Sequence, residues 1–422
     1  MAGKDRVIGM NFLKTSFWAS LSTGVTMLCG LITTKYVAVI IGPQGMAYVG
    51  QFTNATMMLS FLASAACGSG VVKYVSEYKE EAKRRVIISS SLALVLSCTL
   101  VVSLVCIVFS YFLSKLIFDT PEFTIVFIVF GSFLVFSVFN NIVTSILNAL
   151  GKIHQMAILN ITMAVANIAF LLFGKHFWGI KGVLLANITS SAVMFYLFYT
   201  ILKKTGLAPS WPQIRKPDPA IIRLLLGFSL MTVVSGILAP TVQLFIRTKL
   251  LHNLNPFAAG LWQANTRLSD YYLNFVYAVM GVYYLPKLSQ LKEKADIKKE
   301  LLLGYLRIMP LVLLITISVW LMRDLIVKYL LSHQFIEMLS LMKWQLFGDV
   351  IKIASWILAY LVIAKAMKKA FILTEIGFAV VSTAVSYVFI NHFGLVGTVY
   401  AFSLNSFLYL IAQLVIVWKY IL

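Results

Sequence analysis

Two apolar stretches of the sequence each carry a row of polar and charged side chains at helical spacing. Steps of three or four residues place side chains on one face of a helix. The row within residues 258–284 is Gln263, Arg267, Asp270 and Asn274. The row within residues 338–364 is Gln345, Asp349 and Lys352, continued by Trp356 and Tyr360. Basic side chains bind phosphate groups, so the rows favour an anion-binding site.

These charges are costly wherever lipid surrounds them. A charged side chain at the bilayer centre costs about 2.5–3.5 kcal/mol, so the four charges of these rows together with Lys343 would cost on the order of 15 kcal/mol. They must therefore face the protein interior or a wet cavity, and the excess of basic groups favours an anionic ligand such as a diphosphate. The candidate diphosphate-binding residues are Arg267, Lys352, Lys343, Arg247, Lys35 and Lys249.

A purely structural role for the polar groups stays open. Arg267 with Asp270, and Asp349 with Lys352, could be neutralised pairs that hold helices together. Uncharged polar side chains at helix depth suit sugar hydroxyls, but they equally suit hydrogen bonds between helices. The candidate sugar-facing residues are Gln51, Asn54, Asn141, Asn148, Gln263 and Asn274.

The composition requires that lipid surrounds most of the chain. Of 422 residues, 60% are hydrophobic and 12% are charged, and the mean hydropathy is +0.90; soluble domains are about 45–50% apolar and about 25% charged. About 20 apolar residues span a bilayer as a helix. Twelve segments qualify: 13–40, 50–72, 86–112, 123–150, 157–175, 182–202, 222–247, 258–284, 305–322, 338–364, 371–391 and 396–418. We therefore predict an all-α polytopic membrane protein with about twelve transmembrane helices.

The distribution of basic residues predicts the orientation. If the N-terminus is cytoplasmic, the cytoplasmic segments hold 23 of the 35 lysines and arginines, whereas the clear loops on the other side hold five. Cytoplasmic loops are the basic ones in membrane proteins, so both termini are predicted to lie inside. The formal net charge of +20 mostly reflects this bias. No basic surface large enough for nucleic acid is predicted.

The chain divides into two related halves. A linker rich in proline and charge, 206–221, separates an N-terminal six-helix lobe, 1–205, from a C-terminal six-helix lobe, 222–422. Similar segments recur in the same order at a nearly constant interval along the chain, which indicates an internal repeat. The paired segments are 32–35 with 246–249, 42–43 with 255–256, and 76–80 with 289–293. Repeated transporter halves usually hold the substrate site between them.

Several longer motifs resemble one known family. They are IGPQGMAYVGQF (41–52), GSGVVKYVSEY (68–78), GLWQANTRLSDYYLNF (260–275), YYLPKLSQL (283–291) and the run from WLMRDLIVKYLL to YLVIAKA (320–366). On these motifs the chain resembles the bacterial polysaccharide-unit flippases of the Wzx type, which carry lipid III or O-antigen units. That family lies within the multidrug/oligosaccharidyl-lipid/polysaccharide exporter superfamily.

The resemblance implies a fold, a substrate and a mechanism. The fold would be two six-helix lobes in a V around a central cationic cavity. The substrate would be an undecaprenyl diphosphate-linked oligosaccharide, of enterobacterial common antigen or O-antigen type. Alternating access would move it from the cytoplasmic to the periplasmic leaflet of the bacterial inner membrane, coupled to an ion gradient, with protons the favoured ion. By the same resemblance, Arg267 and Lys352 would contact the diphosphate, and Asp270 and Asp349 would couple ion movement to transport.

Two other functions are weighed against this one. A drug or cation antiporter of the same superfamily would need an acidic cavity. A membrane-embedded sugar polymerase or ligase would need a sizeable periplasmic loop, and the predicted loops are short. We therefore predict no enzyme activity, no catalytic residue and no cofactor beyond the gradient. The four cysteines and five histidines show no metal-ligand spacing. A monomer is expected, and a polysaccharide polymerase and chain-length machinery are candidate partners.

Overall fold

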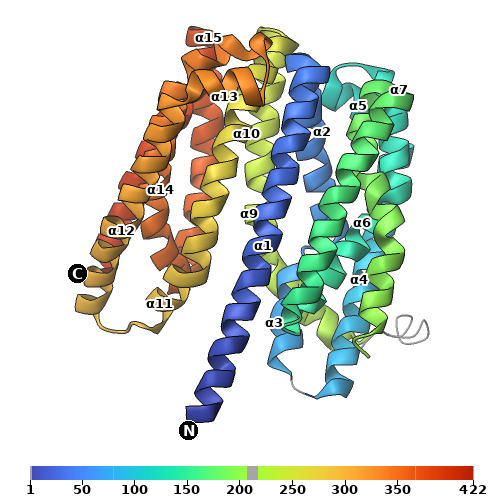
Figure 1. The fold of residues 1–422 in the computed structure, drawn as a ribbon, viewed down its shortest axis with the longest axis vertical. Helices are drawn as coiled ribbons and strands as arrows, with labels where there is room; N and C mark the ends of the chain where they lie inside the picture. The colour runs from blue at the N-terminus through green and yellow to red at the C-terminus, as the bar shows by residue number, and fades with distance from the viewer. Residues whose placement is uncertain (1, 79, 207–216, 366, 422) are drawn as a thin grey trace. The chain divides into compact units, whose positions relative to one another are not determined.

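The computed structural model describes residues 2–78, 80–206, 217–365 and 367–421. Side chains are described in these ranges except at 2–16, 228–235, 278, 279, 282 and 421. The described residues are almost entirely helical and contain no strand (Figure 1). Because lipid offers no hydrogen-bond partner, a spanning chain must satisfy its backbone groups internally, and the helix does so within one segment.

Among the described residues, the first half of the chain forms seven α-helices and one short 3₁₀ helix. They are α1 (Ala2–Ile40), α2 (Gly42–Ala63), α3 (Gly68–Glu77), α4 (Glu81–Val108), α5 (Ser110–Phe118), η1 (Pro121–Phe123), α6 (Thr124–Ala149) and α7 (Ile153–Lys203). The second half contains α9 (Pro219–Asn253), α10 (Pro256–Val279), the π-helix η2 (Met280–Tyr284), α11 (Leu285–Gln290), α12 (Lys294–Leu321), α13 (Arg323–Leu330), the 3₁₀ helix η3 (His333–Met338), α14 (Leu339–Ala364) and α15 (Lys368–Ile421).

Seven helices in the described ranges are long and apolar enough to cross a membrane. The bent pair α2 and α3, which meet at 42°, would make an eighth span. The chain is therefore a multi-pass membrane protein, and the predicted all-α polytopic fold is confirmed. The count of about twelve spans stays a prediction.

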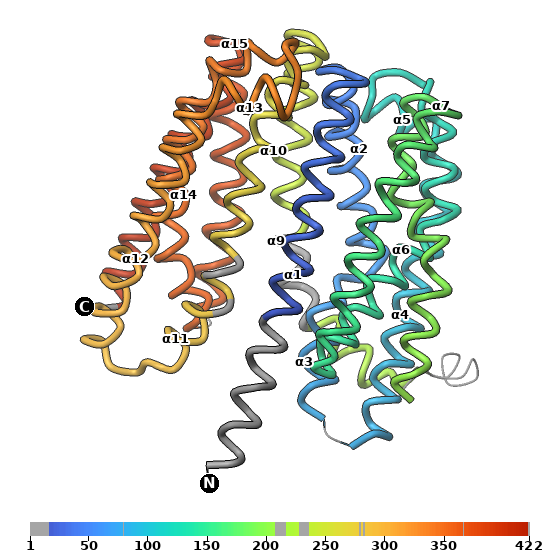
Figure 2. The backbone as a smooth tube through the Cα atoms, in the orientation of Figure 1, coloured from blue at the N-terminus to red at the C-terminus, as the bar shows by residue number. Residues whose placement is uncertain are grey.

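Two of the seven helices turn back on themselves. α7 has 51 residues and α15 has 54, so each would measure about 77 Å or more if straight, against a hydrocarbon core of about 30 Å. Each breaks at one glycine with left-handed geometry, Gly179 (φ 58°) in α7 and Gly394 (φ 60°) in α15. Figure 2 shows the chain reversing within both helices. Only glycine adopts this conformation at little steric cost.

A second glycine lets the two arms of each reversal touch. A Cβ atom on Gly182 would overlap the backbone of Gly174, and one on Gly397 would overlap the backbone of Phe389. The same interval along the chain separates Gly182 from Gly397 and Gly179 from Gly394. The same hairpin geometry is therefore built twice, by residues at equivalent positions of the two halves.

The rest of the element order repeats in the same way. α6 and α14 begin at Thr124 and Leu339, which are separated by the interval that separates Gly179 from Gly394. α2 and α10 each begin with a proline in the first turn, Pro43 and Pro256, at an interval only slightly shorter. Proline suits this position because its missing N–H would have no helical partner there. These intervals agree with the spacing of the internal repeat found in the sequence.

Packing divides the chain into two compact units. Unit 1 comprises Met1–Thr33 and Phe52–Ile237, and unit 2 comprises Thr34–Gln51 and Leu238–Leu422. The predicted lobes 1–205 and 222–422 follow chain order, and their boundaries stay a prediction. The predicted linker 206–221 lies mostly outside the described residues. Within unit 2, the start of α2 packs directly on α10, because a Cβ atom on Gly260 would overlap the carbonyl of Pro43.

The close approach within α15 leads to a stability prediction. Gly397→Ala should destabilise the protein by about 1–3 kcal/mol, because the added methyl group overlaps backbone atoms that cannot move aside. Gly377→Ala is the matched control: it lies in the same helix with open space around it, and alanine favours helix by up to about 1 kcal/mol. Thermal unfolding of the purified protein in detergent measures both. Equal midpoints for the two variants would contradict the hairpin packing.

Candidate functional site

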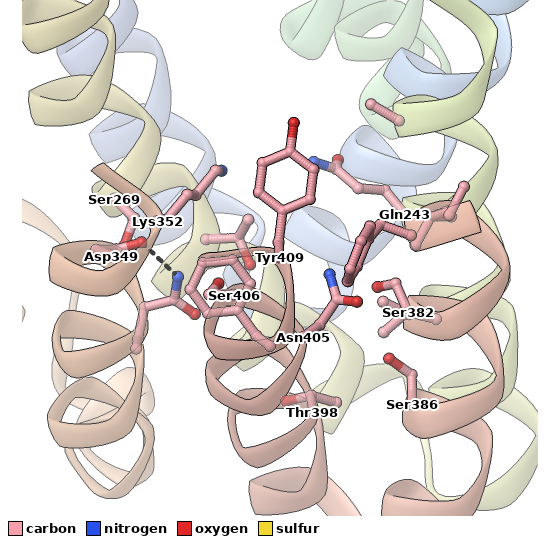
Figure 3. Close-up of a pocket in the computed structure, with 18 of the residues that line it drawn as sticks. Gln243, Ser269, Asp349, Lys352, Ser382, Ser386, Thr398, Asn405, Ser406 and Tyr409 are labelled. Carbon is pink, nitrogen blue, oxygen red and sulfur yellow. Dashed lines mark hydrogen bonds between the residues drawn. The ribbon is translucent and has the colours of Figure 1, made fainter. Parts of the chain in front are cut away.

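Unit 2 encloses a polar cavity of about 270 Å³ within its own helices. Its walls come from α9, α10, α14 and α15. Three of the sequence-predicted residues line it: Asp270 from α10, and Asp349 and Lys352 from α14. In Figure 3, Asp349, Lys352 and Ser269 lie together on one side, and Gln243, Ser382 and Ser386 lie on the other. The two polar rows of the sequence therefore meet at one site.

Asp349 is held in this cavity by three side-chain hydrogen bonds. Its side chain is fully buried. Its carboxylate accepts hydrogen bonds from Ser269 Oγ at 2.7 Å, from Gln345 Nε2 at 3.2 Å and from the hydroxyl of Tyr272. Asn265 Nδ2 in turn donates to Gln345 Oε1 at 3.3 Å. The network ties α10 to α14 and supplies the partners that a buried polar group needs.

Lys352 enters the same cavity without a carboxylate partner. Its Nζ lies 5.5 Å from the ring centroid of Phe402, within cation–π range. The ion pairs formed by described residues join other side chains, so neither Asp349 with Lys352 nor Arg267 with Asp270 comes within 4.0 Å. The structure therefore does not show the neutralised pairs within one helix that the alternative interpretation requires. Lys352 therefore forms no direct ion pair among the described residues, although Asp270 and Asp349 line the same cavity.

Arg247 occupies a different place. It is fully buried, its guanidinium donates to Gln51 Oε1 at 3.4 Å and to Gln263 Oε1, and it lies 5.3 Å from the ring of Trp262. Gln51 Nε2 also donates to Thr248 Oγ1 at 2.9 Å. Two of the candidate sugar-facing residues therefore serve as hydrogen-bond acceptors for this arginine, at the junction of α2, α9 and α10.

The remaining candidate residues lie outside the unit 2 cavity. Lys35 and Lys343 are exposed and Arg267 is half-buried, while Lys249 Nζ lies 4.1 Å from the ring centroid of Tyr387. Among the candidates for sugar binding, Asn54 is buried and Asn148 and Asn274 are exposed. Asn141 lines a separate cavity in unit 1. The roles of these residues stay predictions.

The sequence reasoning missed a third carboxylate in the cavity. Glu375 of α15 lines it, beside Tyr409, whose hydroxyl donates to Glu375 Oε1 at 3.3 Å. The signal was present, since Glu375 is the one charged residue within the predicted span 371–391. Its isolation hid it, because no second charge one turn away marks a polar face. With Glu375 included, the described lining holds three carboxylates and one lysine.

No metal-binding cluster is evident in the described ranges, where no three histidine, cysteine, aspartate or glutamate side chains group suitably. The four cysteines are free.

Comparison with known proteins places the chain among membrane transporters. A family model described as "Polysaccharide biosynthesis protein" matches residues 12–292. The chain is 29% identical over 374 residues to the lipid III flippase of Escherichia coli (strain K12), which covers 87% of this chain and 88% of that protein. It matches the lipid III flippase of Shigella flexneri to the same extent. These relatives are flippases, in line with the prediction that the chain is not an enzyme.

Solved structures share the fold. An inward-facing multidrug resistance MATE family transporter of the MOP superfamily aligns with a TM-score of 0.75 at 16% identity, covering 96% of this chain and 98% of that chain. The lipid II flippase MurJ, in an inward closed conformation, aligns with a TM-score of 0.72 at 15% identity, covering 96% of this chain and 87% of that chain. At this identity the likeness concerns the fold alone.

The buried network around Asp349 predicts a large difference between two substitutions. Asp349→Leu removes the acceptor of three hydrogen bonds and leaves Ser269 Oγ and Gln345 Nε2, both buried, without it, at about 1–3 kcal/mol each, so the variant should unfold at a much lower temperature. Asp349→Asn keeps an acceptor oxygen in place and should stay close to the parent. Asp324→Leu removes an exposed carboxylate and is the control. Thermal unfolding in detergent distinguishes them, and three similar midpoints would show that the network contributes little.

Proposed function

Because the chain belongs to the polysaccharide biosynthesis protein family, we propose that it is a flippase that moves a lipid-linked oligosaccharide across the membrane. The similarity to lipid III flippases over 87% of the chain supports this function. We take the substrate to be an undecaprenyl diphosphate-linked oligosaccharide of the enterobacterial common antigen or O-antigen type. Transport runs from the cytoplasmic to the periplasmic leaflet of the inner membrane, with both termini in the cytoplasm.

The observation that carries the proposal is a lysine without an ion pair in a cavity inside a membrane protein. Lys352 lines the unit 2 cavity and forms no ion pair with any described carboxylate. Placing such a charge at bilayer depth costs free energy, and a phosphate oxygen recovers it through a charge-assisted hydrogen bond. In our proposal Lys352 contacts the diphosphate, with Arg267 of α10 as a second contact.

The carboxylates of the cavity provide a route for coupling to protons. Asp270 and Asp349 line the same cavity as Lys352. When either carboxylate takes up a proton, the net charge around a bound diphosphate becomes more positive, and when it loses the proton the hold on the diphosphate weakens. We propose that this exchange couples the hold on the diphosphate to a proton gradient during alternating access.

A second function has one observation in its favour. The described lining of the unit 2 cavity contains three carboxylates, Asp270, Asp349 and Glu375, against one lysine. Such a lining also suits a cationic ligand, as a drug or cation antiporter would need. The two functions differ in what they transport, so a diphosphate lipid and an organic cation supplied to the same preparation distinguish them.

A leaflet-transfer assay tests the flippase. The protein in liposomes should move labelled undecaprenyl diphosphate oligosaccharide between leaflets, and Lys352→Gln should raise the half-saturating concentration about 10–100-fold, because a hydrogen bond from a charged group contributes about 1.5–3 kcal/mol. Arg267→Ala should act in the same direction. Lys328→Gln, which removes an exposed lysine from α13, is the control. Transfer of an organic cation but of no diphosphate lipid would establish the antiporter instead.

The coupling carboxylates need a different readout. Asp270→Asn and Asp349→Asn should remove the acceleration of transfer by a proton gradient while slow transfer without a gradient persists. Ser382→Ala, which changes the opposite wall of the cavity without altering its charge, should keep the acceleration. The measurement is the ratio of initial transfer rates with and without a pH difference across the liposome membrane. An unchanged ratio in both aspartate variants would remove these residues from the coupling mechanism.

A further inference from the structure

Unit 1 contains a second, larger cavity of a different chemical kind. Its volume is about 550 Å³, and its walls come from α2, α6 and α7 with Gly236 of α9. This is within the size range of pockets that bind small organic ligands. Not one of the described residues that line it carries a charge. We call it the unit 1 cavity. Its main polar side chains are Ser137, Asn140, Asn141, Thr144, Asn160 and Asn187.

The unit 1 cavity and the charged cavity of unit 2 occupy equivalent places in the internal repeat. The repeat pairs α2 with α10, α6 with α14 and α7 with α15. Each charge of unit 2 that projects from α10, α14 or α15 into its cavity can therefore be compared with the residue at the equivalent position. The pairs that line both cavities are Met57 with Asp270, Ser137 with Lys352, and Asn160 with Glu375. One scaffold therefore carries ions in unit 2 and neutral groups in unit 1.

The amides of the unit 1 cavity have hydrogen-bonding capacity that the protein does not use. Asn140 is 5% exposed; its Nδ2 donates to the carbonyl of Ser191 at 2.9 Å, while its Oδ1 has no partner. The side-chain amides of Asn141, Asn160 and Asn187 line the cavity and bond to no other described side chain or backbone group. Asn141 and Asn187 are exposed and Asn160 is half-buried, so these three amides are accessible to a ligand. Asn140 is the buried one, and because buried polar groups are nearly always paired, its unpaired Oδ1 indicates a polar ligand or water.

Aromatic rings accompany these amides. Phe52, Phe61, Phe130 and Phe198 contribute to the same walls. A sugar presents hydroxyl and amide groups at its rim and C–H groups on its faces, and a pocket of amides, hydroxyls and apolar rings matches both kinds of surface. An anion or a cation would find no opposite charge among the described lining residues.

We propose that the unit 1 cavity binds uncharged sugar residues of the lipid-linked substrate through Asn141, Asn160 and Asn187. The inference rests on the proposed function and adds to it a separate site for the sugar. The charged cavity of unit 2 then acts on the diphosphate, and the unit 1 cavity supplies affinity that depends on the glycan. Substrates that lack the saccharide lose the affinity supplied by the unit 1 cavity and keep the affinity supplied by the unit 2 cavity.

Two lipid probes and two kinds of variant test the inference. The probes are undecaprenyl diphosphate bearing a trisaccharide and undecaprenyl diphosphate bearing no sugar. Asn160→Leu and Asn187→Leu should each raise the half-saturating concentration of the trisaccharide lipid about tenfold, equivalent to ~1.4 kcal/mol, and leave that of the sugar-free lipid unchanged. Asn167→Leu is the matched control, because Asn167 lies on the same helix but does not line the cavity. Lys352→Gln should weaken both lipids alike.

Direct binding separates failure of the inference from failure of the proposed function. The free trisaccharide should raise the unfolding temperature of the parent protein in detergent and should do so less in Asn160→Leu and Asn187→Leu. If the parent transfers neither lipid yet the trisaccharide still stabilises it through these residues, the proposed function fails and the sugar site stands. If the parent transfers both lipids and the variants weaken them equally, or not at all, the sugar site is overturned. Asn160→Gln should recover part of the lost affinity, which a merely misfolded variant would not.

Discussion

The structure depends on one constraint: within a bilayer, each polar group must find its partner inside the protein. For the backbone, this constraint selects helices and confines chain reversals to positions that break the hydrogen-bond ladder briefly. Gly179 and Gly394 provide such reversals, each with a left-handed backbone and with a close contact between the two arms. For side chains, the constraint explains why Asp349 accepts hydrogen bonds from two helices and why Arg247 donates hydrogen bonds to two glutamines. Polar side chains that have no such partner are then the ones to consider for ligand binding.

Sequence reasoning recovered the features that depend on local spacing. The apolar segments predicted where helices form. Asp270 from one polar row, and Gln345, Asp349 and Lys352 from the other, line one cavity. The spacing of residues along a helix shows which of them share a face, but not which other helix packs against that face. For that reason Gln263, although on the same row as Asp270, could not be seen to bond Arg247 of another helix. The alternative that paired Asp349 with Lys352 failed for a similar reason, since Ser269 and Tyr272 of α10 compete for the carboxylate.

Glu375 shows a further limit of the same reasoning. A single carboxylate in an apolar segment forms no periodic pattern that would mark a polar helix face. Its hydrogen-bond partner is Tyr409, 34 residues away along the chain and on the second arm of the α15 hairpin. The hairpin brings the two together because Gly394 reverses the chain between them. The reversal has a local cause in one left-handed glycine, whereas the contact between Glu375 and Tyr409 follows from how the two arms pack. The spacing of residues along the sequence does not show which residues of the two packed arms come into contact.

The internal repeat also explains how one fold can handle a ligand of mixed chemistry. Equivalent positions of the two units, such as Ser137 and Lys352, line cavities built from the same helices in the same order. Exchanging a serine for a lysine at such a position changes the charge of a cavity while the helix and its packing stay as they are. A lipid-linked oligosaccharide joins a dianionic group to a neutral, hydroxyl-rich one, and no single lining suits both. In our proposal, two copies of a helical scaffold that differ in charge resolve this conflict, because each copy matches one part of the ligand without weakening the other.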